Sequence, residues 1–156
     1  MFKSPTCTAQ DKALAERLAR HAGIDCEELG KAMFSRGASA DMPADDLLRY
    51  DMKEFHLASH SLAISQITTV DSEPFLHMKD AFIQSLEKIR KEKQYDIALM
   101  MITNVLKEGT ELLFVGDSEI IRSAFSADDL RDHHVFLPQV LSRKKQIVPA
   151  LSQIWG

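Results

Sequence analysis

Several features are scarce in this sequence, and each scarcity excludes a class of protein. Two cysteines, Cys7 and Cys26, are too few for a disulfide framework and are not spaced as a Cys-x-x-Cys pair. No apolar run approaches the roughly 18 residues of a membrane-spanning helix, and the N-terminus has no signal-peptide core. These absences predict a protein of a reducing, cytoplasmic compartment that does not associate with a membrane.

An excess of positive charge is also missing. Lys and Arg total 19 and Asp and Glu 23, so the formal net charge is -4. This balance excludes a generally basic nucleic-acid binder, and we expect no nucleic-acid partner. It leaves room for a local basic pocket, which can still concentrate an anionic ligand. With 156 residues, 45% of them apolar, the chain can bury the core of one domain.

Hydrophobic spacing predicts an α/β fold with a mixed central β-sheet flanked by α-helices. Apolar runs at 97–102 and 112–115 predict buried strands, and the β-branched segment 55–70 predicts a hairpin that turns near residues 58–60. Gly109 and Gly116 are interpreted as turn residues that flank a strand. Helical spacing and capping residues predict a helix that begins after Thr6 or Thr8 and stops at Gly23, and a second helix from Asp25 that ends near Gly37. Further helices are predicted within 43–48, 72–89, 118–125 and 146–154.

The most distinctive chemistry lies in the basic segment Ser142-Arg143-Lys144-Lys145-Gln146. It follows the apolar run 135–141, which predicts a strand that ends in a cationic loop at a sheet edge, where α/β proteins commonly bind ligands. Arginine offers a planar fork for two phosphate oxygens, and lysine offers a compact point charge. The segment therefore favours phosphate or pyrophosphate. The alternative is a solvated basic turn, the commonest role of a short Lys/Arg cluster.

Catalytic and metal-binding patterns are otherwise weak. His56 and His60 are four residues apart, as in zinc-binding helices, but they lie in a predicted strand and turn and lack the glutamate of His-Glu-x-x-His. No Ser/His/Asp order, Gly-rich phosphate loop or paired-carboxylate site stands out. We therefore expect no metal ligand and no catalytic residue within this chain.

The segment 142–151, SRKKQIVPAL, together with Phe136-Leu137-Pro138, resembles the C-terminal signature of family II inorganic pyrophosphatases of the DHH phosphoesterase superfamily. Nearly the whole chain shares the resemblance, which is to the C-terminal, DHH-associated domain and the end of the segment that leads into it. The further matching segments, in the order the family shows, are FKSPT at 2–6, GKAMF at 30–34, TVD at 69–71, MIT at 101–103 and LKEG at 106–109.

The resemblance implies half of a two-domain hydrolase that converts diphosphate and water to two phosphates. Residues 1–8 would be the tail of the interdomain linker, and 9–156 a single substrate-binding domain. The N-terminal DHH domain of the same parent protein would hold manganese or cobalt, with magnesium as an alternative, and the nucleophilic water. By motif, Arg143 and Lys144 correspond to the family's substrate-binding pair, and Lys145 belongs to the same signature with a less defined role. The chain alone should be inactive, and its start within the interdomain segment suits either an excised piece or a natural truncation.

One departure from the family lies in the second predicted helix. The position of a further substrate-binding lysine is Ser35 here, and Arg36 is the candidate replacement. The alternative is that Arg36 is a solvated arginine near a helix C-terminus, where the helix dipole favours a cation.

The triplet Asp132-His133-His134 matches the name-giving motif of the superfamily by coincidence, because the family's motif lies in the N-terminal domain. We interpret the triplet as structural or solvated. Two alternatives to the pyrophosphatase remain open. One is a related DHH-superfamily exopolyphosphatase or phosphodiesterase, and the other is a non-catalytic module that binds a phosphate ligand or a protein.

Overall fold

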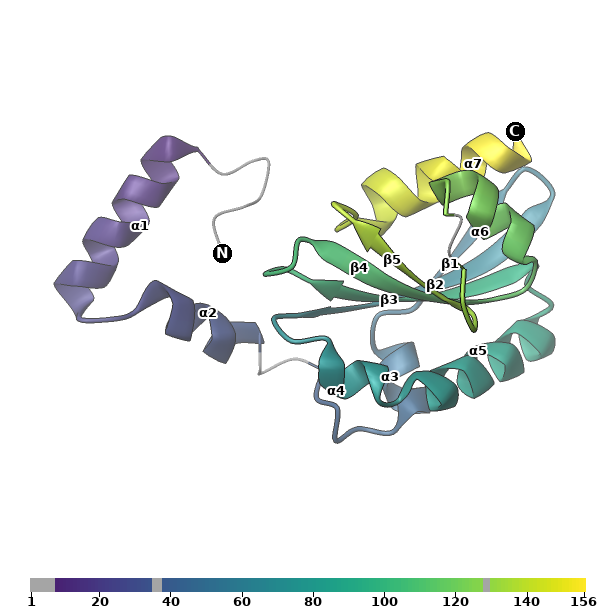
Figure 1. The fold of residues 1–156 in the computed structure, drawn as a ribbon, viewed down its shortest axis with the longest axis horizontal. Helices are drawn as coiled ribbons and strands as arrows, with labels where there is room; N and C mark the ends of the chain where they lie inside the picture. The colour runs from purple at the N-terminus through teal and green to yellow at the C-terminus, as the bar shows by residue number, and fades with distance from the viewer. Residues whose placement is uncertain (1–7, 35–37, 128–129) are drawn as a thin grey trace. The chain divides into compact units, whose positions relative to one another are not determined.

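The computed structural model describes residues 8–34, 38–127 and 130–156, in two compact units, 1–37 and 38–156 (Figure 1). The first unit contains α1 (Ala9–Ala22) and α2 (Cys26–Phe34). Thr8 caps α1, because its Oγ1 accepts from the Asp11 N–H at 3.2 Å while Asp11 Oδ2 accepts from the Thr8 N–H at 2.8 Å. α1 ends at Gly23, whose φ of 66° suits a residue without a side chain. The predicted linker tail lies, except for Thr8, outside the described residues.

The second unit is built on a five-stranded sheet in the order β1-β2-β3-β4-β5. β2 and β3 are parallel and the other neighbours are antiparallel. The predicted hairpin is β1–β2, with Ala58 in its turn at a φ of 52°. The strands are β1 (Lys53–Leu57), β2 (His60–Thr69), β3 (Ile97–Asn104), β4 (Gly109–Val115) and β5 (His134–Pro138). The α/β fold with a mixed central sheet is confirmed.

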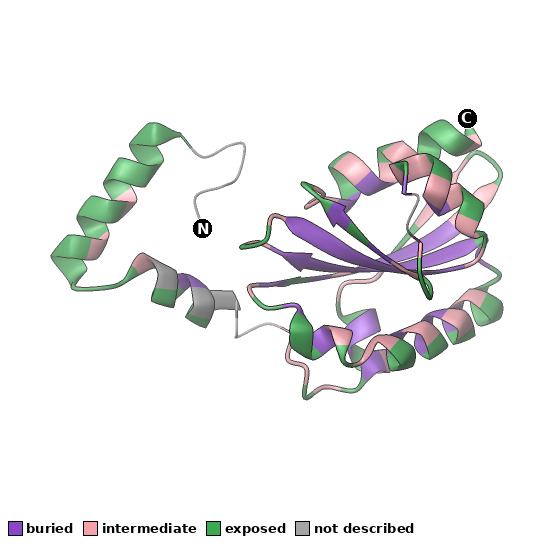
Figure 2. Cartoon of the chain, in the orientation of Figure 1, coloured by how far each residue is buried: buried purple, intermediate pink, exposed green. Residues whose placement is uncertain are grey.

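Helices cover both faces of this sheet (Figure 1). One face packs against α3 (Ala44–Tyr50), α4 (Glu73–Leu76) and α5 (Lys79–Lys93), and the other against α6 (Ser118–Phe125) and α7 (Val148–Trp155). Every residue of β3 is buried, because its alternating side chains enter two separate hydrophobic clusters (Figure 2). The central strands therefore form a rigid platform between two helical layers.

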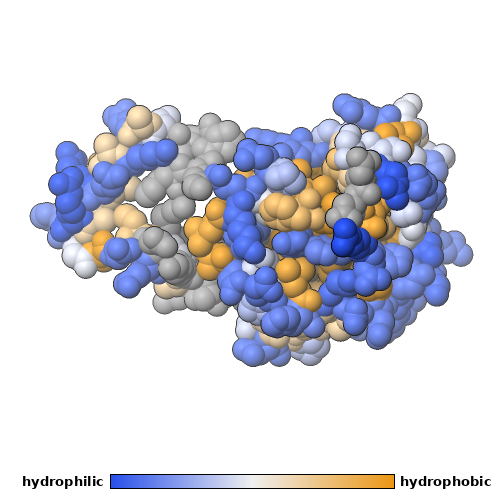
Figure 3. All heavy atoms as spheres, in the orientation of Figure 1, coloured by the Kyte–Doolittle hydropathy of each residue, from blue (hydrophilic) through white to orange (hydrophobic). Residues whose placement is uncertain are grey.

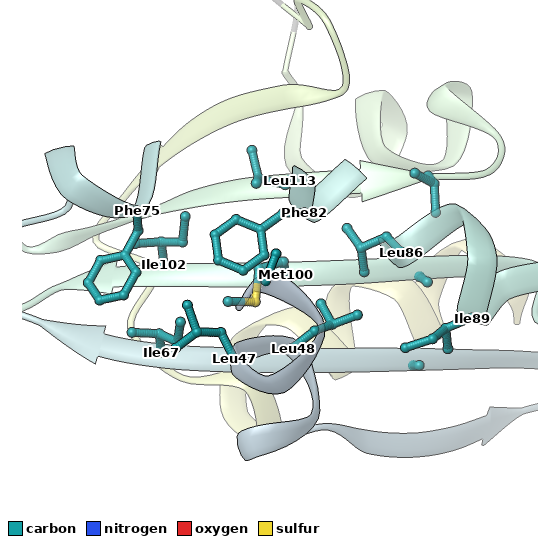
Figure 4. Close-up of a cluster of buried hydrophobic side chains, with 14 of the residues drawn as sticks. Leu47, Leu48, Ile67, Phe75, Phe82, Leu86, Ile89, Met100, Ile102 and Leu113 are labelled. Atoms are coloured by element: carbon teal, nitrogen blue, oxygen red, sulfur yellow. The ribbon is translucent and has the colours of Figure 1, made fainter. Parts of the chain in front are cut away.

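The predicted long helix after Ser72 is two helices in the structure. α4 ends before His77, and the Met78 N–H donates to the Phe75 carbonyl, three rather than four residues back. The predicted apolar stripe continues across this break, because Phe75 of α4 and Phe82 of α5 are buried in the same hydrophobic cluster (Figure 4). The hydrophobic spacing could not reveal the break, since both helices bury the same side.

On the face of the second unit seen in Figure 3, hydrophobic areas lie among hydrophilic residues. Its large exposed apolar side chains are Tyr50, Leu106, Phe136 and Ile154. Within the described parts of the chain, no helix has the length and apolar character needed to cross a membrane.

Candidate anion-binding turn

The basic segment is a helical turn, not the loop that the sequence predicts. Arg143–Ile147 forms a π-helical turn that continues directly into α7, and we call it the basic turn. Ser142 begins it in an extended conformation, and its Oγ accepts from the Lys145 N–H at 3.2 Å. The preceding strand is also shorter than predicted, because β5 ends at Pro138. The cations therefore sit on a structured turn instead of a free loop.

Side chains from the sheet hold the segment that connects β5 to the basic turn. Thr110 Oγ1 donates to the Val140 carbonyl at 2.6 Å, and Gln66 Nε2 donates to the Leu141 carbonyl at 3.2 Å. Gln66 Nε2 also donates to Thr103 Oγ1 at 3.0 Å, and the hydroxyls of Thr103 and Thr110 lie 3.0 Å apart. Side chains of β2 and β4, linked to each other through Thr103 of β3, thus satisfy backbone groups that have no partner strand.

Gln146, a residue of the basic turn, also hydrogen-bonds the backbone of this connecting segment. Its Oε1 accepts from the N–H groups of Leu141 and Ser142 at 2.9 and 3.0 Å. Its Nε2 donates to the carbonyl of Gln139 at 2.7 Å. Gln139 has a φ of 64°, and its N–H donates to the Glu108 carbonyl at 2.7 Å. One side chain of the basic turn therefore makes three hydrogen bonds that set where the turn begins.

Arg143 is the buried cation of the turn, with 7% of its side chain exposed. Its Nη2 donates to the two carboxylate oxygens of Asp51 at 3.1 and 3.0 Å, just beyond the end of α3. Its Nη1 donates to the backbone carbonyls of Asp51 and Ile64, the latter at 2.9 Å. Arg143 thereby ties the basic turn to both α3 and β2.

The third nitrogen of Arg143 is in a different situation. Among the described residues, Nε has no hydrogen-bond partner, and it is not one of the buried side-chain atoms that lack one. Nε therefore reaches solvent, although most of the guanidinium is buried.

Lys144 and Lys145 are exposed, and neither forms an ion pair with any described residue. Since Asp51 balances Arg143, these two lysines supply the uncompensated positive charge of the turn. A compact ammonium on a rigid turn can bind an anion without a large loss of backbone freedom. The structure thus brings together Arg143, Lys144 and Lys145, whereas Arg36 and Ser35 lie outside the described residues.

The three residues of the Asp132-His133-His134 triplet each contact a different part of the second unit. Asp132 Oδ2 lies 3.3 Å from Lys79 Nζ, and His134 Nε2 lies 2.8 Å from Glu111 Oε2. His133 makes an edge contact with the Phe114 ring at 5.6 Å between centroids. In the described ranges, no group of three or more His, Cys, Asp or Glu side chains is placed to hold a metal ion.

A hollow of about 490 Å³ lies elsewhere on the second unit and includes none of the basic turn. In its wall, Arg90 Nε donates to Glu87 Oε2 at 2.9 Å, and this hydrogen bond lowers the pKa of the Glu87 carboxyl. The remaining lining residues are Ile83, Asp96, Val115, Gly116, Asp117 and His133. Its charged groups are largely acidic or already paired, so the hollow is less suited to phosphate than the basic turn is.

Sequence reasoning missed the residues that support the basic turn. Asp51 lies 92 positions before Arg143, and Gln66 lies 75 positions before Leu141. No local spacing connects residues so far apart. The signal that was available was chemical: Thr103 and Thr110 are hydroxyl residues at one end of two predicted buried strands, where a polar group needs a partner.

Comparisons with known proteins find relatives that are named inorganic pyrophosphatases. A protein from Lactobacillus acidophilus, named a probable manganese-dependent inorganic pyrophosphatase, is 40% identical over 100% of this chain and 51% of its own length. A Clostridium acetobutylicum protein with the same name is 34% identical over 97% of this chain and 49% of its own. The crystal structure of a putative family II inorganic pyrophosphatase from Methanococcus jannaschii matches with a TM-score of 0.79 and 34% identity, over 97% of this chain and 50% of that one.

The chain spans about half the length of these relatives and aligns with their C-terminal half. The family profile described as the DHHA2 domain matches residues 31–154, which include the whole sheet, the helices on both of its faces and the basic turn. The chain therefore belongs to the DHHA2 domain family.

Proposed function

We propose that this chain is the substrate-binding half of a manganese-dependent inorganic pyrophosphatase and that the basic turn binds diphosphate. The observation that carries the proposal is the arrangement of Lys144 and Lys145 on a turn that Gln146 and Arg143 hold in place. Both lysines are exposed and neither forms an ion pair within the described ranges 8–34, 38–127 and 130–156. The names of the relatives and the length of the match support it.

The chemistry of diphosphate hydrolysis explains why such a turn is useful. Phosphoryl transfer needs positioned phosphates and neutralised negative charge more than it needs covalent help from the protein. In this proposal Lys144 contacts a phosphate oxygen directly, and Lys145 adds charge beside it. Arg143 contributes through the part of its guanidinium that reaches solvent. The proposed role of Arg36 remains a prediction from the sequence.

Metal ions would come from the other half of the enzyme. The described residues of this chain do not form a metal-ligand set, so we derive no step through manganese and assign no metal ligand here. When bound there, the metals would supply the nucleophilic water and further charge neutralisation. We therefore propose that the partner of this chain is an N-terminal DHH domain, and that the assembled enzyme works in the cytoplasm.

The test compares Lys144→Ala with Lys91→Ala in a protein that contains this chain joined to a metal-binding N-terminal half. Lys91 is an exposed lysine of α5 whose Nζ lies 3.6 Å from Glu87 Oε1. Lys91→Ala therefore removes the same charge at a position away from the basic turn. We expect Lys144→Ala to lower kcat/KM for pyrophosphate, with a loss of roughly 2 to 4 kcal/mol in the stabilisation of the transition state. Lys91→Ala should leave it nearly unchanged. Equal behaviour of the two variants would show that the basic turn is only a solvated surface.

The same protein distinguishes the competing functions. Turnover of tripolyphosphate or a phosphodiester in preference to pyrophosphate would favour a related hydrolase. Binding without any hydrolysis in the presence of manganese would favour a non-catalytic phosphate-binding module.

A further inference from the structure

Two of the three guanidinium nitrogens of Arg143 fix the orientation of the group. Nη1 donates to the carbonyls of Asp51 and Ile64, and Nη2 donates to the Asp51 carboxylate. Because a guanidinium is planar, fixing these two nitrogens also fixes the direction of the Nε–H. Nε–H lies on the side edge of the group and has no acceptor among the described residues, so this edge remains for another acceptor.

We propose that Asp51 is a positioning residue that aims this side edge of Arg143 at phosphate oxygens beside Lys144. The inference rests on the proposed function of the basic turn and adds a residue to it. An Nε–H that is held in one direction can donate a charge-assisted hydrogen bond to a phosphate oxygen with little further loss of side-chain freedom. Asp51 would therefore strengthen anion binding although it carries a negative charge itself.

The opposite role, in which Asp51 competes with the substrate for Arg143, fits the contacts less well. To leave Asp51, the guanidinium would have to give up two backbone carbonyls as well as the carboxylate. A buried carbonyl without a donor costs free energy, so this release is unfavourable. A phosphate bound at the side edge requires no such release, because Nε already reaches solvent.

The positioning role and the competing role of Asp51 predict opposite changes in anion affinity when its charge is removed. Removing a negative charge close to an anion site should tighten anion binding if charge alone acts. Loss of positioning should weaken binding, because the arginine must then be ordered by the ligand. A weaker complex after neutralising Asp51 is therefore opposite to the simple electrostatic expectation.

The experiment titrates this chain with inorganic pyrophosphate at constant ionic strength and follows the arginine Nε–H signals by NMR. In the unmodified chain, the Nε–H signal of Arg143 should shift as pyrophosphate binds. Asp51→Asn should raise the dissociation constant about tenfold, the effect of weakening one hydrogen-bonded charged contact. Asp46→Asn is the matched control, because Asp46 is an exposed carboxylate of α3 without an ion pair to any described residue. It should leave binding unchanged or slightly tighter.

A second measurement does not depend on the variant keeping its fold. In the unmodified chain saturated with pyrophosphate, the Nη–H signals of Arg143 that face Asp51 should persist while Nε–H shifts. Their loss on ligand binding, or tighter binding by Asp51→Asn, would overturn the positioning role in favour of competition. Equal affinity of Asp51→Asn and the unmodified chain would overturn it as well. If pyrophosphate shifts neither Arg143 nor Lys144 in the unmodified chain, the proposed function itself fails, and the positioning role fails with it.

Discussion

Trp155, in the last turn of α7, stacks on His60 at the start of β2. The ring centroids are 4.7 Å apart and the planes differ by 14°. Nδ1 of His60 also lies 3.3 Å from Oδ1 of Asp96, the residue just before β3. The contact joins the end of the chain to the start of two central strands. It therefore holds the C-terminal end of α7, the helix that follows the basic turn.

The first prediction concerns this stacking. Trp155→Ala should lower the free energy of unfolding by about 1 to 2 kcal/mol, because it removes a partly buried aromatic ring and its stacked partner contact. Urea denaturation followed by circular dichroism measures the change. Ile154→Ala, an exposed neighbour in the same helix, should cost clearly less. Similar losses for both variants would show that the stacking adds no stability.

The second prediction concerns acid stability. The Ser61 N–H donates to Asp96 Oδ2 at 2.8 Å, and this hydrogen bond, together with the nearby His60, holds the pKa of the Asp96 carboxyl below its ordinary value. A lowered folded-state pKa adds stability that is present above the unfolded value and is lost as pH falls through the folded value. Because Asp96 is 42% exposed, the contribution should stay below about 1 kcal/mol.

Melting temperatures between neutral pH and pH 3 test this linkage. Asp96→Asn should be less stable than the unmodified chain at neutral pH, and the two curves should converge as the solution becomes more acidic than pH 3.8. Glu92→Gln, which neutralises an exposed carboxylate of α5, should run parallel to the unmodified chain throughout. A constant gap between Asp96→Asn and the unmodified chain down to pH 3 would contradict the prediction.

The third prediction concerns the hydroxyl groups under the connecting segment. Thr110→Val keeps the shape of the buried side chain but leaves the Val140 carbonyl and the Thr103 hydroxyl each short of one partner. We expect a loss of about 1 to 3 kcal/mol in the free energy of unfolding. Thr68→Val, at an exposed position of β2, is the control and should change stability by less than about 0.5 kcal/mol. Hydrogen exchange should also become faster at residues 139–142 in Thr110→Val alone.

The fourth prediction separates anchoring from anion binding within the basic turn. Arg143→Met keeps most of the apolar stem but removes every hydrogen bond to Asp51 and Ile64, so it should destabilise the chain by about 2 kcal/mol or more. Lys144→Met, at an exposed and unpaired position, should change stability by less than about 0.5 kcal/mol. If both variants unfold at the same urea concentration as the unmodified chain, Arg143 is not an anchor.

Much of the fold could be predicted because its signals are local. The apolar runs at 97–102 and 112–115 became β3 and β4, and residues 118–125 became α6 with the predicted bounds. A strand buried on both faces must be apolar throughout, so its sequence shows it directly. The break between α4 and α5 could not be predicted, because the same apolar spacing serves one helix or two with a common buried face.

The sequence by itself determined where positive charge is concentrated, because the cluster Arg143-Lys144-Lys145 is basic whatever the fold. The resemblance of the chain to family II pyrophosphatases agrees with the names of the relatives found. Only the tertiary structure decided how the three cations differ. Arg143 is buried because Asp51 and Ile64, far away in the sequence, supply acceptors that offset its desolvation. The two lysines find no such partners in the part of the chain that the structure describes, and they are exposed to water. Burial and pairing depend on long-range contacts, and a local pattern of charges does not contain them.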